Sequence, residues 1–362
     1  MASRQSASYA DPMDSAPLSD TPSARRILVR LGYLGALLTL VVLVGVFAGL
    51  GTTLPEVGTT LPGLGTTLPE VAQDPPLYVT FLDVGQGDAV LITSPEGKRA
   101  LIDAGPGADL GPARWGVDSL DLVIASHPHA DHIGGMTQVL GSRPVRFYMD
   151  NGQPHTTRTY EVVMKMLQDR PEITYLEAVP RTLQLGSVTL RVLPMPPDPG
   201  SNLSVGIIVE YGSFSAFLSG DSERLELQHF VSAQVVPDVT LLKAPHHGSN
   251  NGMTESFLNV GAPEVVVISV GSENDYGHPM PIALGAYARF SDQVLRTDRD
   301  GEVVVAGYAD GRYELFTGDA AHALRWARAG VGADGSVEPT NSTTNSTDPA
   351  VGADRRKDEG RK

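Results

Sequence analysis

The sequence predicts one α/β domain in which helices cover two sheets, and three observations support this fold class. Short apolar runs recur between residues 77 and 318; they are rich in Val and Ile and bounded by Gly, Pro, Asn or Asp, which is typical of strands. Helical periodicity appears in segments between these runs. At roughly 100–200 residues per domain, the 362-residue chain has room for one large domain with tails, or for two modest domains.

The apolar pattern predicts the order of the elements. Each expected strand is a run of four to eight residues, and each expected helix has apolar side chains at a spacing of three and four. We expect strands at Tyr78–Leu82, Ala89–Thr93, Arg99–Asp103, Leu120–Ser126, Thr189–Leu193, Val205–Tyr211, Phe214–Ser219, Val239–Lys243, Val265–Val270 and Glu302–Ala306, and helices at Thr159–Gln168, Glu223–Val231 and Leu284–Phe290.

The N-terminal region predicts a membrane anchor. Residues 1–26 are rich in Ser, Ala and Pro and are expected to be disordered. Within residues 27–50, Leu31–Leu50 has no charge and is long enough to cross a hydrocarbon core of about 30 Å. Arg25, Arg26 and Arg30 lie on its N-terminal side, which predicts a single-pass protein of the cell membrane with the rest of the chain outside. The alternative is a cleaved signal peptide and a secreted protein, but such an apolar region is usually shorter.

Two segments flank the predicted domain at residues 77–318. Residues 51–76 contain a heptapeptide repeat, and a Pro and a Gly in every copy exclude a continuous helix, so we expect a semi-extended stalk. Residues 319–362 are expected to be a mostly disordered tail. Its two N-x-S/T sequons, at Asn341 and Asn345, agree with an outside location.

Composition excludes several function classes. The chain has no Cys, so disulfide scaffolds, thiolate metal sites and cysteine nucleophiles are ruled out. Its formal net charge is −15, and residues 77–318 hold 16 Lys and Arg against 29 Asp and Glu, a net −13. This balance argues against a basic protein that coats nucleic acid. Any phosphate contact must therefore run through metal ions and a few local donors.

The strongest chemical signal is the run Ser126-His127-Pro128-His129-Ala130-Asp131-His132-Ile133-Gly134-Gly135, which follows an apolar strand. In an extended segment, residues two apart point the same way, so His127 and His129 can reach one metal. Asp131 and His132 follow where the chain turns into a helix, and can serve a second metal nearby. A lone His is usually a satisfied core or surface residue, but four potential ligands in six residues indicate a metal site.

This HxHxDH run resembles the first metal motif of the metallo-β-lactamase fold superfamily, and further blocks match that family in order and spacing over about 240 residues. The resemblance implies an αββα four-layer sandwich with two divalent metals. It also implies that Asp103, in Leu101–Gly105, braces the metal loop, and that Asp221, after Gly220, bridges the metals. The last metal motif of the family corresponds to His246-His247-Gly248-Ser249.

More narrowly, the region resembles the extracellular hydrolase domain of ComEC-type competence proteins and its stand-alone relatives. The resemblance rests on Phe81–Ala89, Asn202–Ser204, Lys243–Ser249 and Asn274–Pro279. It implies a nuclease-like hydrolase whose partners are DNA or another phosphodiester, and a DNA-uptake channel. The multi-helix channel of those proteins is not recognised in this sequence, so only the hydrolase module carries over. No feature specifies an oligomeric state.

One departure from the superfamily affects the expected ligands. Many relatives supply a third His to the first metal before the bridging Asp, but the only His in that interval, His155, comes too early and in a polar loop. Asn202 stands where that ligand is expected. Fewer imidazoles and more oxygen favour Mn²⁺ over the Zn²⁺ usual in the family. We expect His127, His129, Asp221 and Asn202 or water at the first metal, and Asp131, His132, Asp221 and His247 at the second, with His246 as a supporting residue or substrate contact.

Two metals about 3.5–4 Å apart would lower the pKa of a bridging water, so that hydroxide is available to attack phosphorus or a carbonyl carbon. Asp131 is expected to orient this nucleophile. Lys243, His246, Ser249 and His278 are candidates to contact phosphate or donate to the leaving oxygen. Three of them have ordinary alternatives: Lys243 as a strand-end charge, Ser249 as a helix cap and His278 as a turn residue.

The Gly-rich segment Phe81–Ala89 contributes two more candidates. Asp83 and Asp88 are expected to support the site or face the substrate, although a hairpin turn alone would explain one Asp and the glycines.

The sequence thus predicts a membrane-anchored, outward-facing, metal-dependent phosphodiesterase. A lactamase- or thioesterase-like carboxyl hydrolase on the same metals is one alternative. A non-catalytic surface binding module is the other.

Overall fold

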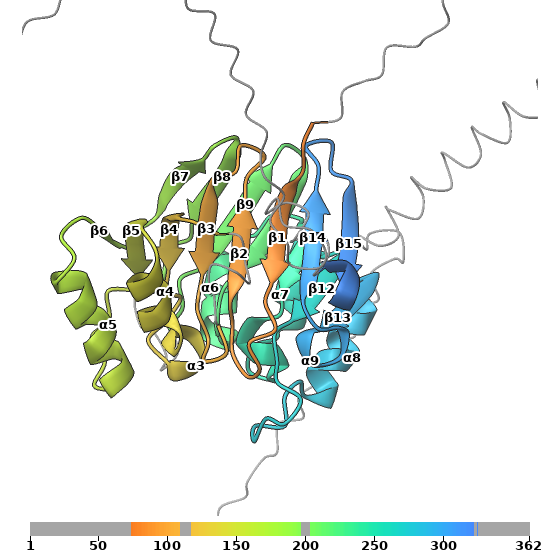
Figure 1. Cartoon of the computed structure of the whole chain (residues 1–362). Helices are drawn as coiled ribbons and strands as arrows, with labels where there is room; N and C mark the ends of the chain where they lie inside the picture. The colour runs from red at the N-terminus through yellow and green to blue at the C-terminus, as the bar shows by residue number, and fades with distance from the viewer. Residues whose placement is uncertain (1–73, 109–116, 197–202, 322–323, 325–362) are drawn as a thin grey trace, which may run out of the picture.

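The computed structural model describes residues 74–108, 117–196, 203–321 and 324 (Figure 1). The predicted membrane segment, the stalk, Asn202 and nearly all of the predicted tail lie outside these residues. Among the helices that are described, none has both the length and the apolar character needed to cross a membrane.

The described residues form two sheets. The first has eight strands, with an antiparallel half from β15 to β3 and a parallel half from β3 to β6. Its strands, in spatial order, are β15 (Tyr313–Thr317), β14 (Val303–Gly307), β1 (Leu77–Phe81), β2 (Val90–Thr93), β3 (Arg99–Ile102), β4 (Leu120–Ile124), β5 (Val145–Asp150) and β6 (Thr174–Glu177).

The second sheet has seven strands and the same mixed character. Strands β10 to β13 are parallel, whereas β7 to β10 are antiparallel. Its strands, in spatial order, are β13 (Gln293–Arg296), β12 (Val265–Ile268), β11 (Leu241–Lys243), β10 (Phe214–Leu218), β9 (Ile207–Tyr211), β8 (Val188–Val192) and β7 (Arg181–Leu185).

Within the described residues, eight helical segments accompany the sheets. Two caps explain where α5 and α7 begin, because the hydroxyls of Thr157 and Thr254 accept the backbone N–H of Tyr160 and Phe257. The segments are α3 (Ala130–Ile133), α4 (Met136–Ser142), α5 (Arg158–Gln168), α6 (Arg224–Ser232), the 3₁₀ turn η2 (Pro245–Gly248), α7 (Glu255–Gly261), α8 (Pro281–Phe290) and α9 (Thr297–Asp300).

Three apolar layers establish the four-layer order of helices and sheets. Alternate residues of a strand point to opposite faces of its sheet. In each sheet both faces carry buried apolar side chains, because one face packs on the other sheet and one packs on helices. Between the sheets, Val79 and Phe81 pack with Val209 and Leu241. On the outer face of the first sheet, strand residues pack against α4 and α5; on that of the second, they pack against α6, α7 and α8. The expected αββα arrangement is therefore confirmed for the described domain.

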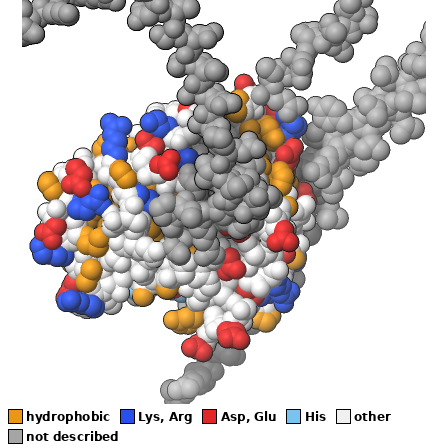
Figure 2. All heavy atoms as spheres, in the orientation of Figure 1, with side chains coloured by type: hydrophobic (Ala, Val, Ile, Leu, Met, Phe, Trp, Pro, Cys, Tyr) orange, Lys and Arg blue, Asp and Glu red, His pale blue; other side chains and the backbone are white. Residues whose placement is uncertain are grey.

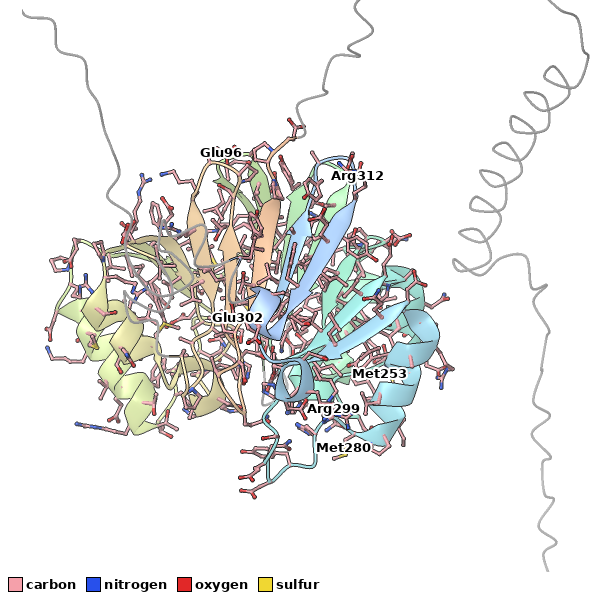
Figure 3. The ribbon with its side chains drawn as sticks, turned by 45° about the vertical axis from the view of Figure 1, so that its right-hand side comes forward. Glu96, Met253, Met280, Arg299, Glu302 and Arg312 are labelled. Atoms are coloured by element: carbon pink, nitrogen blue, oxygen red, sulfur yellow. The ribbon has the colours of Figure 1, made fainter. Side chains whose placement is uncertain are left out.

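The ten expected strands and three expected helices are all present, with shifted boundaries. The loops that follow β4, β10, β11 and β12 meet at one end of the sandwich, as expected for the carboxyl ends of neighbouring parallel strands (Figure 1). Figure 3 shows Arg299 and Met280 toward this end, and Glu96 and Arg312 at the opposite one.

Candidate metal centre

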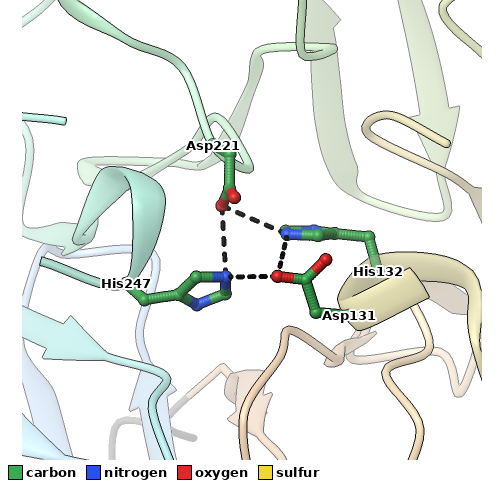
Figure 4. A group of neighbouring side chains, drawn as sticks. All are labelled: Asp131, His132, Asp221 and His247. Atoms are coloured by element: carbon green, nitrogen blue, oxygen red, sulfur yellow. Dashed lines mark ion pairs between the residues drawn. The ribbon is translucent and has the colours of Figure 1, made fainter. Parts of the chain in front are cut away.

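Four metal-binding side chains from three loops converge at this end of the sandwich. Asp131 and His132 lie on α3 after β4, Asp221 follows β10, and His247 lies in η2 after β11. One ligand atom from each lies within 4.8 Å of the others (Figure 4). Carboxylate oxygen and imidazole nitrogen are suitable donors for Zn²⁺ or Mn²⁺. These residues come from three separate motifs of the sequence, and the fold brings them together.

The two oxygens of Asp221 face different histidines. Its Oδ1 lies 3.1 Å from His132 Nε2 and 3.4 Å from His247 Nε2. Its Oδ2 lies 3.9 Å from His127 Nε2 and 3.7 Å from His246 Nε2. We call Asp131, His132, His247 and the Oδ1 atom of Asp221 the Oδ1 group. We call His127, His129, His246 and the Oδ2 atom of Asp221 the Oδ2 group. A carboxylate placed in this way can bridge two cations.

His127 and His129 face each other as the two-residue spacing predicts. His127 Nε2 lies 3.0 Å from His129 Nδ1. Two nitrogens bound tetrahedrally to one Zn²⁺ at about 2.0–2.1 Å would be about 3.3 Å apart. The pair therefore has nearly the spacing of two ligands of one ion. His155 also lies here, with its ring centroid 5.6 Å from that of His129.

Buried polar atoms without partners indicate that the Oδ1 group suits a cation. Asp221 Oδ1, His132 Nε2 and His247 Nε2 are all buried and make no hydrogen bond of normal geometry. A buried polar group without a well-formed hydrogen bond costs about 1–3 kcal/mol, and the ion pairs of Asp221 Oδ1 with the two rings offset only part of this cost. The three atoms point at one another (Figure 4). A divalent ion among them would satisfy all three at once.

Asp103 braces this centre from behind. It is buried, and its two oxygens accept hydrogen bonds from Ser126 N at 2.6 Å and Ser126 Oγ at 2.7 Å. His132 Nδ1 lies 2.8 Å from Asp103 Oδ2. A ring nitrogen held in this way leaves Nε2 directed to the site. Asp103 therefore fixes both the metal loop and the His132 ring.

His247 is oriented in the same manner. Its Nδ1 donates to the Ser269 carbonyl oxygen at 2.9 Å and lies 3.4 Å from Asp88 Oδ1. Asp88 also forms a buried ion pair with Lys243, whose ammonium donates to Gly220 O at 2.9 Å.

This placement corrects the expectation for Lys243. Its side chain is only 2% exposed and lies behind the metal-facing atoms, so it is not free to contact substrate. Because a buried ammonium requires an acidic partner, Lys243 neutralises Asp88 and ties β11 to the turn that carries Asp221.

Unusual backbone conformations position the ligands. His246 and His247 have φ of 49° and 51°, a conformation that costs non-glycine residues of order 1–3 kcal/mol each. The turn presents their rings to different oxygens of Asp221. Gly220 has φ of 52°, and a Cβ there would lie 2.5 Å from Ser126 Oγ. Only glycine lets the two ligand loops approach so closely.

A second chain of hydrogen bonds supports Asp221. The backbone N–H of Asp221 donates to Ser204 Oγ at 3.0 Å, and Ser204 N donates to Glu226 Oε1 at 2.9 Å. Ser204 Oγ also lies 3.4 Å from His127 Nδ1. Burial raises the pKa of Glu226 from 4.5 to about 7. Sequence reasoning missed Glu226, whose only signal was its place three residues after Glu223 in a helix capping box.

The pKa directions differ between the two groups in the metal-free chain. Burial lowers the pKa of His127 and of His129, so both rings are neutral and able to bind metal. Burial also opposes charge on His132 and His247, but Asp221 and further carboxylates raise the pKa of both. The charge of His132, followed by that of His247, outweighs burial and holds the pKa of Asp221 well below its usual range.

The remaining candidates lie at varied places. The His278 ring centroid is 5.5 Å from that of His246, at the mouth of the site, and burial lowers its pKa. Ser249 is buried and its Oγ accepts the Asn251 N–H, as expected for the cap that was its ordinary alternative, and its contact with substrate stays a prediction. Asp83 is exposed and accepts the Gly85 N–H, so it does not brace a metal ligand, and its substrate-facing role stays a prediction. Asn202 lies outside the described residues.

His155 is the residue at the site that sequence reasoning set aside. It was judged too early in the chain and in a polar loop. The structure brings that loop beside His129 because β5 pairs in parallel with β4, so both strands end at the same edge. The missing signal was β5 itself, which the sequence analysis did not predict.

Comparisons with known proteins place the sequence among related chains. A family model described as the metallo-beta-lactamase superfamily matches residues 82–272. The chain is 31% identical to ComE operon protein 3 of Bacillus subtilis (strain 168) over an alignment of 255 positions, which covers 62% of this chain and 32% of that protein. It is 27% identical to competence protein ComA of Neisseria gonorrhoeae over an alignment of 235 positions, which covers 62% of this chain and 31% of that protein.

The chain thus spans about a third of the length of these curated relatives. Among solved structures, it is similar to the metallo-beta-lactamase fold protein YhfI from Bacillus subtilis, with 16% identity and a TM-score of 0.44. That match covers 67% of this chain and 100% of the other.

Proposed function

The chain belongs to the metallo-β-lactamase superfamily, and from that premise we propose that it is a membrane-anchored hydrolase that cleaves phosphodiester bonds with two divalent metal ions. Homology to competence proteins supports the proposal. The observation that carries it is the bridging position of Asp221, whose two oxygens face two separate sets of histidines.

The two groups provide a ligand set for each ion. The Oδ1 group would hold one ion through Asp131, His132, His247 and Asp221. In the Oδ2 group, His246 takes the place of the third imidazole that the sequence appeared to lack, since its Nε2 faces the same oxygen as His127. Both members of the His246–His247 pair thus become ligands, one in each group. Ions bound here would make hydroxide available near neutral pH and offset the charge that develops on the substrate oxygens.

Three side chains of the site are placed to act on a substrate. Asp131 is the most exposed member of the Oδ1 group, with 26% of its side chain accessible, so it can accept a hydrogen bond from the attacking water and orient it. His278 lies at the mouth and is neutral at pH 7, so it can donate to a phosphate oxygen. His155, beside His129, can donate from Nε2 because its Nδ1 already accepts the Thr157 N–H.

Phosphodiester hydrolysis suits this centre better than opening of a lactam. Two ions on either side of one carboxylate can stabilise both the attacking and the leaving oxygen of an in-line displacement at phosphorus. The ligand set also includes carboxylates from Asp131 and Asp221, which favour Mn²⁺ as well as Zn²⁺.

The proposed location follows from the anchor predicted at residues 27–50. Strand β1 begins at the end of the sandwich opposite the metal centre, so the site faces away from the entering chain (Figure 1). Anchoring by Leu31–Leu50 would therefore leave the site open to substrate outside the cell. Fractionation of expressing cells tests the anchor, and the domain should be found with the membrane. Protease added to intact cells tests the outside location, and the domain should be digested.

The activity is tested with the purified chain and a panel of three substrates. A single-stranded oligonucleotide, a simple phosphodiester ester and a lactam are each incubated with Mn²⁺ or Zn²⁺. We expect turnover of the first two and none of the lactam, and loss of turnover in His129→Ala. Hydrolysis of the lactam alone would favour the carboxyl hydrolase, and no turnover with two metals bound would favour a binding module.

A further inference from the structure

The loop between β12 and α8 projects beyond the sandwich at the end that carries the metal centre (Figure 1; Met280 marks its foot in Figure 3). One side chain holds it in shape. Asn274 donates to the carbonyl oxygens of Gly271 and His278, both at 2.8 Å, and its Oδ1 accepts the His278 N–H at 2.9 Å. Three hydrogen bonds from one amide fix the two sides of the loop, so the residues between them are presented in a defined position.

Tyr276 lies in this loop, and three stacked rings, those of Tyr276, His278 and His247, connect it to the metal centre. We call these three rings the ladder. The Tyr276 ring stacks on His278 with a centroid separation of 5.7 Å and an interplanar angle of 24°. His278 stacks in turn on the ligand candidate His247, at 6.4 Å and 28°. The Tyr276 ring is therefore no more than about 12 Å from the His247 ring. Its plane is set by the same imidazole that lies at the mouth of the site.

The outer face of this ladder is open. Tyr276 is 63% exposed, although a single exposed Tyr would need no explanation. Two more exposed apolar residues lie at the same end: Ile282 at the start of α8, and Leu225 two residues after Glu223, which pairs with His246. Glu273 and Asp275, which precede Tyr276 in the loop, are exposed as well. Figure 2 shows acidic and hydrophobic side chains together at this lower end.

An exposed aromatic ring beside exposed carboxylates disfavours duplex DNA as the substrate and favours a nucleic acid with unpaired bases. The carboxylates beside Tyr276 repel a phosphate backbone that runs along the loop, so the described residues 271–280 offer no basic surface to the backbone of duplex DNA. An aromatic face offers stacking, which every base can use and which carries no sequence preference. Bases are free to stack on protein only where they are not paired.

We propose that Tyr276 is a stacking platform for a nucleobase beside the scissile phosphate, and that the substrate is single-stranded nucleic acid. This inference rests on the proposed phosphodiesterase function and names the substrate class of that site. Tyr276 acts by binding: it holds the base while the phosphate lies at the metal centre. It is a specificity-determining residue, since substrates without a base there gain nothing from it.

The test compares two substrates that share the same phosphodiester. One is a thymidine tetranucleotide, and the other has abasic sugars on both sides of the central phosphate. Both are assayed with Mn²⁺ on the full chain and on two variants: Tyr276→Phe keeps the ring, whereas Tyr276→Leu keeps apolar surface without a stacking plane. Thermal melts of the variants establish that an exposed loop substitution leaves the fold intact. Quenching of 2-aminopurine in the matching position reports stacking without turnover.

We expect the full chain to show a KM about tenfold lower for the tetranucleotide than for its abasic analogue. Tyr276→Phe should keep this difference and the quenching, and Tyr276→Leu should lose both, with the KM for the abasic analogue unchanged. If Tyr276→Leu keeps the full difference, or if the full chain shows none, the stacking inference is wrong while the phosphodiesterase stands. Turnover of neither substrate with both metals bound would instead overturn the proposed function, and this inference with it.

Discussion

The two sides of Asp221 are built from the same residue types but are supported differently. In the Oδ1 group, His132 and His247 are almost fully buried, and each has its Nδ1 held by a carboxylate or a carbonyl. In the Oδ2 group, His127 is equally buried but its Nδ1 lies near two hydroxyls, and His246 is 20% exposed, with its Nδ1 3.3 Å from the partly exposed Glu223. The Oδ1 group is therefore preorganised, and the Oδ2 group is freer to adjust.

This difference indicates unequal affinities for the two ions. A ligand ring that is already oriented loses less entropy when it binds metal, and a carboxylate on its other nitrogen makes it a better donor. We expect the ion of the Oδ1 group to bind first and more tightly. The ion of the Oδ2 group, closer to the solvent-exposed mouth, is the one we expect to exchange.

Removing Asp221 should have the largest effect, because this residue serves both groups. Asp221→Ala is expected to lower phosphodiester turnover by about a thousandfold or more, since loss of the ions removes several kcal/mol of charge stabilisation. Metal content after dialysis should fall for both positions. A variant that keeps two ions and near-normal turnover would rule out the bridging role.

The neighbouring histidines allow a matched comparison of the two groups. His247→Ala should weaken the tighter ion and His246→Ala the weaker one, each by about a hundredfold or more, since a direct ligand contributes at least as much as its supporting residue. Calorimetric titration with Mn²⁺ distinguishes them: one binding event should be lost in each variant, and not the same one. If His246→Ala leaves both events unchanged, His246 is not a ligand.

Substitution of the brace should have a smaller effect that is confined to the Oδ1 group. Asp103→Asn replaces one acceptor by a donor opposite Ser126 and His132, and we expect a ten- to a hundredfold loss of affinity for the tighter ion. Asp83→Asn, which alters an exposed carboxylate in a turn, is the control and should leave affinity unchanged. If the two variants bind the tighter ion with equal affinity, Asp103 does not brace the Oδ1 group.

Glu226 supports Asp221 and His127 from the other side, and its effect should fall on the stability of the fold and not on turnover. Because its pKa rises from 4.5 to about 7 on folding, its contribution to stability is present below about pH 4.5 and is lost as pH rises toward 7. A shift of this size corresponds to about 3 kcal/mol. Glu226→Gln should therefore flatten the pH dependence of unfolding between pH 4.5 and 7, measured by denaturant titration of the metal-free chain. An unchanged slope would show that Glu226 titrates normally.

The fold class could be predicted from sequence because most strands are buried on both faces and appear as continuous apolar runs, as in Val265–Ile268. The strands that were missed lack this pattern. Strand β6 (Thr174–Glu177) is mostly exposed, and β7 (Arg181–Leu185) alternates with polar residues, because each lies at the edge of its sheet. An edge strand buries less apolar surface, and its sequence is correspondingly less distinctive.

Most residues of the site could be predicted from the sequence, but their division between the Oδ1 group and the Oδ2 group could not. Motif spacing singled out His127 and His129, and the family resemblance pointed to Asp221; all three follow recognisable strands. His246 and His247 face different oxygens of Asp221 because both have positive φ. Neither residue is a glycine, so the sequence of the turn does not indicate this conformation. Lys243 was misjudged for a related reason: only the packed structure shows Asp88 beside it.

Electron paramagnetic resonance of the chain loaded with two equivalents of Mn²⁺ tests most directly whether Asp221 bridges two ions. Two Mn²⁺ about 3.5–4 Å apart on one carboxylate should be magnetically coupled and give the multiline spectrum of a pair. The coupling should disappear in Asp221→Ala. A spectrum of two independent Mn²⁺ ions, or binding of a single ion at saturation, would contradict the account of a shared two-metal centre.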